Sequence, residues 1–393
     1  MHATDFDLEN KKTPVRIALF AETYLPQRNG VALILDRLVT RLSQEGNEVL
    51  VVAPTSWRPK GEVVLPPGVQ LVRVPGMPLP RYPDLTLAIP FLPGVLRTVR
   101  EFQPDVIHLV TEYSIGLTGL RIARRLGVPV VASFHTNIPG CLPYYGFEWA
   151  SNMCWRYLRW YHNQAELTFC PSETNRRVLT RHGFENVRIW ARGVDTDRFT
   201  PTHRNTATRE KHGPAEAMHL LYVGRLTPEK DLPVLFEAYQ RVAASNPSRP
   251  VHLVLVGDGA YSDRMRARAP AGVTFAGYLE GKALSEAYSS ADVFVFSSRV
   301  ETLGNVVLEA LASGLPVVAV AEGGTVENVH DGLNGLLCDP GDPRDLARGI
   351  MKLVDEPNLQ TNLARNARAW AEKRTWDAAF APLLASYEEL AKH

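Results

Sequence analysis

The chain has few cysteines and no long hydrophobic run. It contains four cysteines among 393 residues, and no two of them form a Cys-x-x-Cys pair. So long a chain with so few cysteines has no disulfide framework to infer, and a reducing cytoplasm is the simplest location. No window reaches the roughly 18 consecutive apolar residues that a membrane-spanning helix requires. We therefore expect no transmembrane segment.

An excess of charge of one sign is also missing. The formal net charge is +1 at pH 7, which argues against a function that depends on bulk attraction to nucleic acid. Residues 1–12 are polar and acidic, and they lack the basic start and apolar centre of a signal peptide. The hydrophobic share of 45% and the charged share of 22% are typical of a soluble globular protein.

Short apolar runs alternate with helical patterns through the first half of the chain. The runs predict strands at residues 15–20, 48–52, 71–74, 105–109, 129–134 and 167–170. The patterns between them predict helices at residues 31–42, 115–126 and 172–182. Strands that are apolar throughout are buried on both faces of a parallel sheet, so we expect an α/β, doubly wound fold.

The same alternation restarts after a polar stretch at residues 202–212. It predicts strands at residues 219–223, 252–256, 273–275, 293–296 and 316–320, and two or three helices over residues 358–393. Two domains are usual for a chain of this length. We place them at residues 1–200 and 201–374, followed by a terminal helix at residues 375–393 that can return to the first domain.

The spacing of Glu301 and Glu309 is the most informative feature of the second half. The seven residues between them change from loop to helical character near Leu303. Glu309 then lies between one and two turns inside a helix, whereas Glu301 precedes its N-terminus. The free backbone N–H groups of Leu303, Gly304 and Asn305 suit phosphate oxygens. The pattern fits a ligand with hydroxyls at both ends and phosphates in the middle, such as a nucleotide sugar.

Two cations bracket the loop that follows the first strand of the second domain. Arg225 and Lys230 follow Gly224, and both can converge on one anion, which a departing diphosphate requires. A single such residue usually belongs to a solvated loop, but the combination with the glutamate pair favours a binding role. Gly257 follows the next strand, where a simple turn is the alternative.

Three features of the first half leave alternatives open. Gly30, in an Asn-Gly pair after the first strand, indicates either a phosphate contact or an ordinary tight turn. His135 ends a predicted strand, where a catalytic and a structural role are about equally expected. The aromatic and basic stretch at residues 139–169, which includes Trp155 and Trp160, suits a membrane interface or an aromatic core helix equally well.

An apparent metal motif, Asp195-x-Asp197, is rejected. It adjoins the predicted domain boundary and has no further carboxylate or histidine ligands nearby. We expect no metal and no cofactor, because two cations and helix-end amides can stabilise a leaving phosphate by themselves.

Taken together, these motifs resemble the retaining GT-B glycosyltransferases of family 4, from about Val15 to the final helices. The resemblance rests on Gly224-Arg225 with Glu229-Lys230, on Glu301-x7-Glu309, on residues 312–318 and on the linker at residues 192–199. It implies two Rossmann-like domains that face a central cleft, with the nucleotide held mainly by the second. Residues 134–139 and 144–147 further resemble bacterial and plastid enzymes that transfer sulfoquinovose, glucose or mannose to diacylglycerol or a related lipid.

The resemblance also implies roles for individual residues. Arg225 and Lys230 would bind the diphosphate, Glu309 the ribose and Glu301 the sugar, while His135 would lie near the reacting carbon. The donor-binding set is completed by Gly30, Gly224, Gly257, Thr302, Leu303, Gly304 and Asn305. The usual Gly-Gly of the first loop is Asn29-Gly30 here, which leaves the contribution of Asn29 open.

The expected function is the metal-independent transfer of a hexosyl group from a nucleotide-diphosphate sugar to a lipid. UDP is slightly favoured over GDP, and the enzyme would act in the cytoplasm, peripherally on the inner face of the cell membrane. The alternatives are transfer to a soluble sugar or metabolite, a UDP-sugar epimerase of the same fold, and a binding protein with an inactive site. The last would be expected to lack Glu301 or Lys230, and both residues are present.

Overall fold

The computed structural model describes residues 14–27, 29–55, 62–79, 82–89 and 93–392. The expectation for residues 1–12 lies outside this range. The chain folds into two compact units. The first comprises the described residues of Met1–His135 with Trp160–Phe169 and Leu383–His393, and the second comprises Thr136–Arg159 and Cys170–Pro382.

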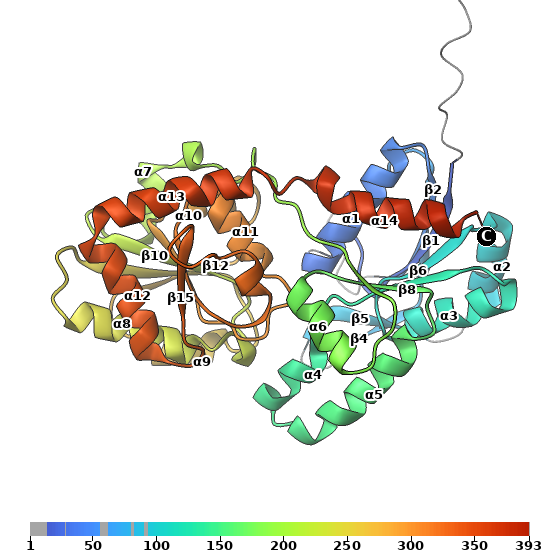
Figure 1. Ribbon diagram of the computed structural model, residues 1–393, viewed down its shortest axis with the longest axis horizontal. Helices are drawn as coiled ribbons and strands as arrows, with labels where there is room; N and C mark the ends of the chain where they lie inside the picture. Colours follow the sequence, from blue (N-terminus) through green and yellow to red (C-terminus); the bar gives the residue numbers. More distant parts are fainter. Residues whose placement is uncertain (1–13, 28, 56–61, 80–81, 90–92, 393) are drawn as a thin grey trace, which may run out of the picture. The chain divides into compact units, whose positions relative to one another are not determined.

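A parallel sheet forms the centre of the first unit (Figure 1). Among the described residues its strand order is β3-β2-β1-β6-β7-β8-β9, of which β9 lies in the stretch Cys170–Pro382 that is assigned to the second unit. The bounds are β1 Arg16–Phe20, β2 Glu48–Pro54, β3 Val69–Val74, β6 Val106–Leu109, β7 Val130–Ser133, β8 Leu167–Cys170 and β9 Val187–Ile189. Every residue of β6, β7 and β8 is buried, which confirms the interpretation of near-continuous apolar runs as parallel strands.

Helices flank this sheet, and an antiparallel hairpin accompanies it. The helices are α1 Gly30–Gln44, α2 Pro93–Phe102 and α3 Ser114–Leu126, and the hairpin pairs β4 Gly76–Leu79 with β5 Tyr82–Ala88. The end of the chain also belongs to this unit. In α14 (Trp376–Leu390), Tyr387 is buried and its hydroxyl lies 2.5 Å from His108 Nδ1 on β6.

A second parallel sheet forms the centre of the other unit, with the strand order β12-β11-β10-β13-β14-β15 among the described residues. The bounds are β10 Met218–Val223, β11 Val251–Val256, β12 Val273–Gly277, β13 Val293–Phe296, β14 Val317–Val320 and β15 Gly335–Cys338. Helices α8 and α12 pack on each other and on β11, β14 and β15, whereas α11 packs on β13 and β14 (Figure 1). The two sheets confirm the α/β class with two Rossmann-like domains.

Further helices precede, connect and follow these strands, and α5 (Ser151–His162) belongs to the second unit up to Arg159 and to the first from Trp160. The α-helices are α4 Ile138–Cys141, α5 Ser151–His162, α6 Glu173–Arg181, α7 Thr206–His212, α8 Leu232–Ala244, α9 Ser262–Arg268, α10 Gly281–Ser290, α11 Asn305–Ala312, α12 Pro343–Asp355 and α13 Pro357–Ala371. The 3-10 turns are η1 Leu142–Tyr145, η2 Glu148–Ala150, η3 Pro201–His203, η4 Pro228–Lys230 and η5 Gly323–Glu327. The two helices α13 and α14 (Trp376–Leu390) confirm the helices expected over residues 358–393.

Helix α7 lies in the stretch that showed no apolar periodicity. Polar contacts hold it in place, since Asn205 caps its first turn and the buried Arg209 bonds to Ser290 O at 2.8 Å and to Asp292 at 2.8 Å. A helix fixed through a buried guanidinium leaves no hydrophobic stripe in the sequence. This explains why the polar stretch at residues 202–212 did not predict a helix.

Candidate active site

The predicted donor residues of the second unit gather at one edge of its sheet. Strand β10 lies between β11 and β13, so the loops that follow these three strands are neighbours. In doubly wound sheets this carboxyl edge is where ligands bind. The loops carry Gly224, Arg225, Lys230, Gly257 and Glu301.

Gly257 allows two of these loops to touch. Its φ is +134°, and a Cβ built on it would lie 2.0 Å from the carbonyl oxygen of Gly224. The Gly257 N–H donates to Gly277 O at 2.8 Å, and the Gly224 N–H donates to Val256 O at 3.0 Å. A side chain at position 257 would force the loops apart, which explains why glycine follows β11.

The two cations of this loop, Arg225 before the turn η4 and Lys230 at its end, differ in exposure and in partner. Arg225 has a side chain that is 65% exposed, and it makes one hydrogen bond of 3.3 Å to Glu229 Oε1. Lys230 is 12% exposed, and its ammonium group forms an ion pair with Glu301. Two of the residues assigned to ligand binding from the sequence are therefore in direct contact, 71 positions apart in the chain.

The loop that carries Glu301 is held from several sides. Ser298 Oγ donates to Glu301 Oε1 at 2.8 Å, and Ser297 Oγ donates to Lys230 O at 2.8 Å. The Gly324 N–H donates to Glu301 O at 2.7 Å. A Cβ on Gly324 would lie 2.3 Å from Thr302 O, so this close approach also requires glycine.

Helix α11 begins later than the sequence indicated. We expected its start near Leu303, but it starts at Asn305, because Gly304 precedes it in the left-handed conformation with φ +81°. Within the described residues, the backbone N–H groups of Gly304 and Asn305 donate to no protein acceptor. These are amides of the helix N-terminus, where anions bind favourably.

Glu309 lies in the second turn of α11 and is fixed by a tyrosine. The hydroxyl of Tyr288, on α10, donates to Glu309 Oε2 at 2.9 Å. Burial raises the pKa of Tyr288 well above its ordinary value, and the nearby Glu309 carboxylate adds to this effect. The tyrosine therefore stays a neutral donor that orients the carboxylate.

Gly30 and His135 belong to the first unit. Gly30 is the first residue of α1, and the side chain of Asn29 caps this helix by accepting from the N–H groups of Val31 at 3.1 Å and Ala32 at 2.9 Å. Asn29 therefore occupies two of the amides that a phosphate would use. His135 lies two residues after the end of β7 and is half-buried. Their roles toward a ligand stay predictions.

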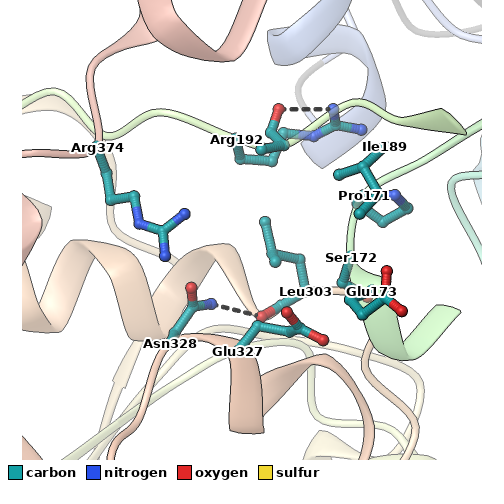
Figure 2. A pocket seen from close by; sticks show the side chains of 10 residues that line it. Pro171, Ser172, Glu173, Ile189, Arg192, Leu303, Glu327, Asn328 and Arg374 are labelled. Atoms are coloured by element: carbon teal, nitrogen blue, oxygen red, sulfur yellow. Dashed lines mark hydrogen bonds between the residues drawn. The ribbon is translucent and has the colours of Figure 1, made fainter. Parts of the chain in front are cut away.

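A separate pocket of about 160 Å³ lies in the second unit (Figure 2). Of the predicted site residues, only Leu303 lines it. Burial lowers the pKa of the Arg192 guanidinium to about 9, and Asn328 Nδ2 donates to Leu303 O at 2.8 Å. The full lining is Pro171, Ser172, Glu173, Ile189, Ala191, Arg192, Leu303, Glu327, Asn328 and Arg374. Two arginines are balanced by two glutamates here, so the pocket has no excess charge.

The aromatic stretch divides between core and surface. Leu158, Tyr161 and His162 are buried, and Trp155 stacks on His182 with ring centroids 3.9 Å apart. By contrast, the large apolar side chains Phe147, Trp149, Met153 and Trp160 are between 48% and 75% exposed. The core-helix alternative therefore holds for one face of the segment, and the membrane-interface alternative for the exposed face stays a prediction. Among the described residues, no helix combines the length and apolar character needed to cross a bilayer.

Several supporting residues did not stand out in the sequence. Three hydroxyl groups donate hydrogen bonds to the glutamates at the carboxyl edge of the second sheet: those of Tyr145 to Glu229, Ser298 to Glu301 and Tyr288 to Glu309. Hydroxyl side chains are common and carry no spacing signal of their own. Glu229 was visible beside Lys230 in the sequence, but only its burial shows that it supports Arg225.

Comparisons with known proteins agree with this geometry. The model "Glycosyltransferase Family 4" matches residues 28–198, and the model "Glycosyl transferases group 1" matches residues 205–370. A GDP-mannose-dependent alpha-mannosyltransferase of Mycobacterium tuberculosis is 39% identical over 95% of this chain and 96% of its own length. A sulfoquinovosyl transferase of Arabidopsis thaliana is 32% identical over 95% of this chain and 73% of its own length.

Solved structures share the fold. The Anabaena protein HepE, crystallised with UDP and glucose, has a TM-score of 0.74 at 20% identity, covering 95% of this chain and 99% of its own. Sucrose-phosphate synthase from Thermosynechococcus elongatus has a TM-score of 0.77 at 21% identity, covering 96% and 99%. Two parallel-sheet units with a charged carboxyl edge thus define a GT-B protein. The chain belongs to the family 4 glycosyltransferases.

Proposed function

We propose that the protein transfers a hexosyl group from a nucleotide-diphosphate sugar to a lipid, with retention of configuration and without a metal. The observation that carries this proposal is the contact of Lys230 with Glu301 at the carboxyl edge of the second sheet, beside the exposed guanidinium of Arg225. These groups supply cations for a diphosphate and a carboxylate for sugar hydroxyls within one small region. The assignment of the individual roles is part of the proposal.

The chemistry follows from these charges. The bond between the anomeric carbon of the sugar and the β-phosphate oxygen breaks, and the acceptor hydroxyl oxygen bonds to the same face of that carbon. The departing phosphate oxygen takes the hydroxyl proton, so no further base is needed. Arg225, Lys230 and the amides at the start of α11 stabilise the charge that grows on the phosphate. Glu301 holds the sugar, Glu309 the ribose, and His135 the sugar near the reacting carbon.

The donor is proposed from the relatives. The residues around Gly257 and Gly277 include no decisive reader of uracil or guanine, and the sequence favoured UDP over GDP only slightly. Three relatives that are 31% to 39% identical are named GDP-mannose-dependent alpha-mannosyltransferases. We therefore place GDP-mannose first and a UDP-linked hexose second.

The acceptor is proposed from the exposed aromatic surface and from a relative. An alpha-monoglucosyldiacylglycerol synthase of Streptococcus pneumoniae is 30% identical over 88% of this chain. On α5, Met153, Arg156 and Trp160 follow one another at helical spacing and are all exposed, and Trp149 precedes them. Apolar rings combined with arginines suit the headgroup region of an anionic membrane. The enzyme would thus act in the cytoplasm, peripherally on the inner face of the cell membrane.

A donor and acceptor panel tests the proposal. The purified protein is incubated with GDP-mannose, UDP-glucose or UDP-galactose, with and without vesicles that contain diacylglycerol. We expect one nucleotide to be released in a vesicle-dependent manner, together with a glycosylated lipid detected by mass spectrometry. Vesicle-independent transfer to an added sugar would indicate a soluble acceptor. Formation of an isomerised UDP-sugar would indicate an epimerase. If no nucleotide is released and no product forms, the protein would be a binding protein with an inactive site.

A further inference from the structure

A tyrosine outside the predicted site contacts the carboxylate that supports Arg225. Tyr145 OH donates a hydrogen bond of 2.8 Å to Glu229 Oε2. The other oxygen, Oε1, accepts from Thr227 Oγ1 at 2.8 Å and from Arg225 Nη2 at 3.3 Å. Glu229 is 2% exposed, so these donors replace water around its charge. Tyr145 reaches it from 84 positions away in the chain.

The segment that carries Tyr145 lies against the charged loop. The turn η1 contacts η4. Cys141, at the end of α4, lies close enough to several charged residues of the proposed donor site for their charges to affect the pKa of its thiol. Burial raises the pKa of that thiol to about 11, and the charges of Glu229, Lys230, Arg225 and Glu301 act on it as well. Residues 138–145 therefore pack directly on the proposed diphosphate site.

The hydrogen bond from Tyr145 affects how strongly Glu229 holds Arg225. A carboxylate that accepts from several donors spreads its charge among them, whereas loss of one donor strengthens its attraction to the rest. Of the three donors named here, Arg225 has the most exposed side chain, at 65%, and the longest hydrogen bond, at 3.3 Å, so it is the one that a ligand can reach. Removing the tyrosine hydroxyl would thus bind the guanidinium more tightly to Glu229 and away from a ligand.

We propose that Tyr145 is a positioning residue, which acts through Glu229 to keep the Arg225 guanidinium available to the diphosphate of the donor. The inference rests on the proposed function, because it takes the diphosphate role of Arg225 as given. It adds a link between the segment at residues 138–145 and donor binding. That segment carries the motif that resembles lipid hexosyltransferases.

Nucleotide binding to the full-length protein tests this link without any need for turnover. GDP and UDP are titrated calorimetrically into the wild type, Tyr145→Phe, Arg225→Ala and the double variant. Tyr144→Phe is the matched control, because it removes one hydroxyl from the same turn. We expect Tyr145→Phe to weaken binding about fivefold, the order expected for one hydrogen bond, and Tyr144→Phe to have no effect. In the Arg225→Ala background, Tyr145→Phe should cause no further loss.

Kinetics and stability separate positioning from a structural role. With an active donor, Tyr145→Phe should raise the KM for the nucleotide sugar about fivefold and leave kcat within about twofold. A lowered Tm with unchanged nucleotide affinity would overturn the proposal, as would an equal loss of affinity with and without Arg225. Failure of the wild type to bind either nucleotide would instead contradict the proposed function, and this inference would fall with it.

Discussion

Lys230 and Glu301 form an ion pair in which the two side chains are only 12% and 15% exposed. Each residue was assigned to a different part of a nucleotide sugar, and each neutralises the other in the structure. A diphosphate that approaches Lys230 would replace one anion by another, while Glu301 would turn to the hydroxyls of the sugar. The pair therefore holds both groups at the edge of the sheet before a donor binds, at little cost in unpaired charge.

Replacement of Lys230 by Ala should lower turnover by roughly two to three orders of magnitude. The ammonium group would stabilise the charge that develops on the departing phosphate, and preorganised charges of this kind have effects of that size. Steady-state kinetics measure the change, and circular dichroism checks that the variant is folded. Arg241→Ala is a matched control, since it removes the exposed ion pair with Glu237 on α8. Near-normal turnover in folded Lys230→Ala would contradict the diphosphate role.

Chelation of divalent metals should leave most of the activity intact. In the proposed mechanism, Arg225, Lys230 and the amides at the start of α11 would provide the positive charge that a metal supplies in other enzymes. Asp195 of the rejected motif is engaged elsewhere, because its Oδ1 accepts from the Arg198 N–H at 3.0 Å. The measurement is transfer rate in EDTA against the rate with added magnesium. Complete loss that one divalent ion restores would show that the account of the leaving group is wrong.

Most strands could be predicted from the sequence, since buried parallel strands are continuous apolar runs. The strand β15, the hairpin β4–β5 and the three-residue β9 were missed. Three residues give no clear period, and the prolines within the two hairpin strands are unfavourable in a strand pattern. The spacing of Glu301 and Glu309 correctly indicated a loop followed by a helix. It could not show that Gly304 adopts a left-handed conformation and delays α11 by two residues.

Contacts between distant residues could not be predicted in the same way. The charges of Lys230 and Glu301 were visible, but their pairing depends on the order of β10 and β13 in the sheet. The bond from Tyr145 to Glu229 had no signal at all, because a single hydroxyl forms no pattern along the chain. Burial of one side of the aromatic stretch likewise depends on partners such as His182, which stacks on Trp155.

Stability should fall as the pH is lowered from about 6.5 toward 5. His108 is fully buried between Tyr387 OH and Ser133 Oγ, at 2.5 and 2.6 Å, and burial lowers its pKa to about 3. Below pH 6.5 the unfolded chain binds a proton at this histidine, whereas the folded chain does not until about pH 3. The free energy of unfolding therefore decreases by up to about 1.4 kcal/mol per pH unit in this range.

Urea unfolding at several pH values measures this dependence. His219 contributes in the same direction, because burial lowers its pKa to about 4. A His108→Gln variant should be less stable at pH 7.5 but show a shallower dependence on pH. Most carboxylates titrate below pH 5. A difference between the two proteins in the slope of unfolding free energy against pH, measured from pH 6.5 to 5, therefore comes from histidines. Equal slopes in the variant and the wild type would show that His108 does not contribute to the pH dependence of stability.

The exposed rings of the aromatic stretch should bind anionic membranes. We expect the double variant Trp149→Ser/Trp160→Ser to cosediment less with vesicles of phosphatidylglycerol and phosphatidylcholine, because exposed rings enter the headgroup boundary while Arg156 and Arg159 meet anionic lipids. High salt should weaken binding of the wild type. Trp155→Ser is the contrasting variant: its ring stacks on His182 and packs against Phe184, so its loss should lower the Tm and leave vesicle binding largely intact. If the wild type fails to bind at low salt, the lipid acceptor is wrong and a soluble sugar or metabolite becomes the expected acceptor.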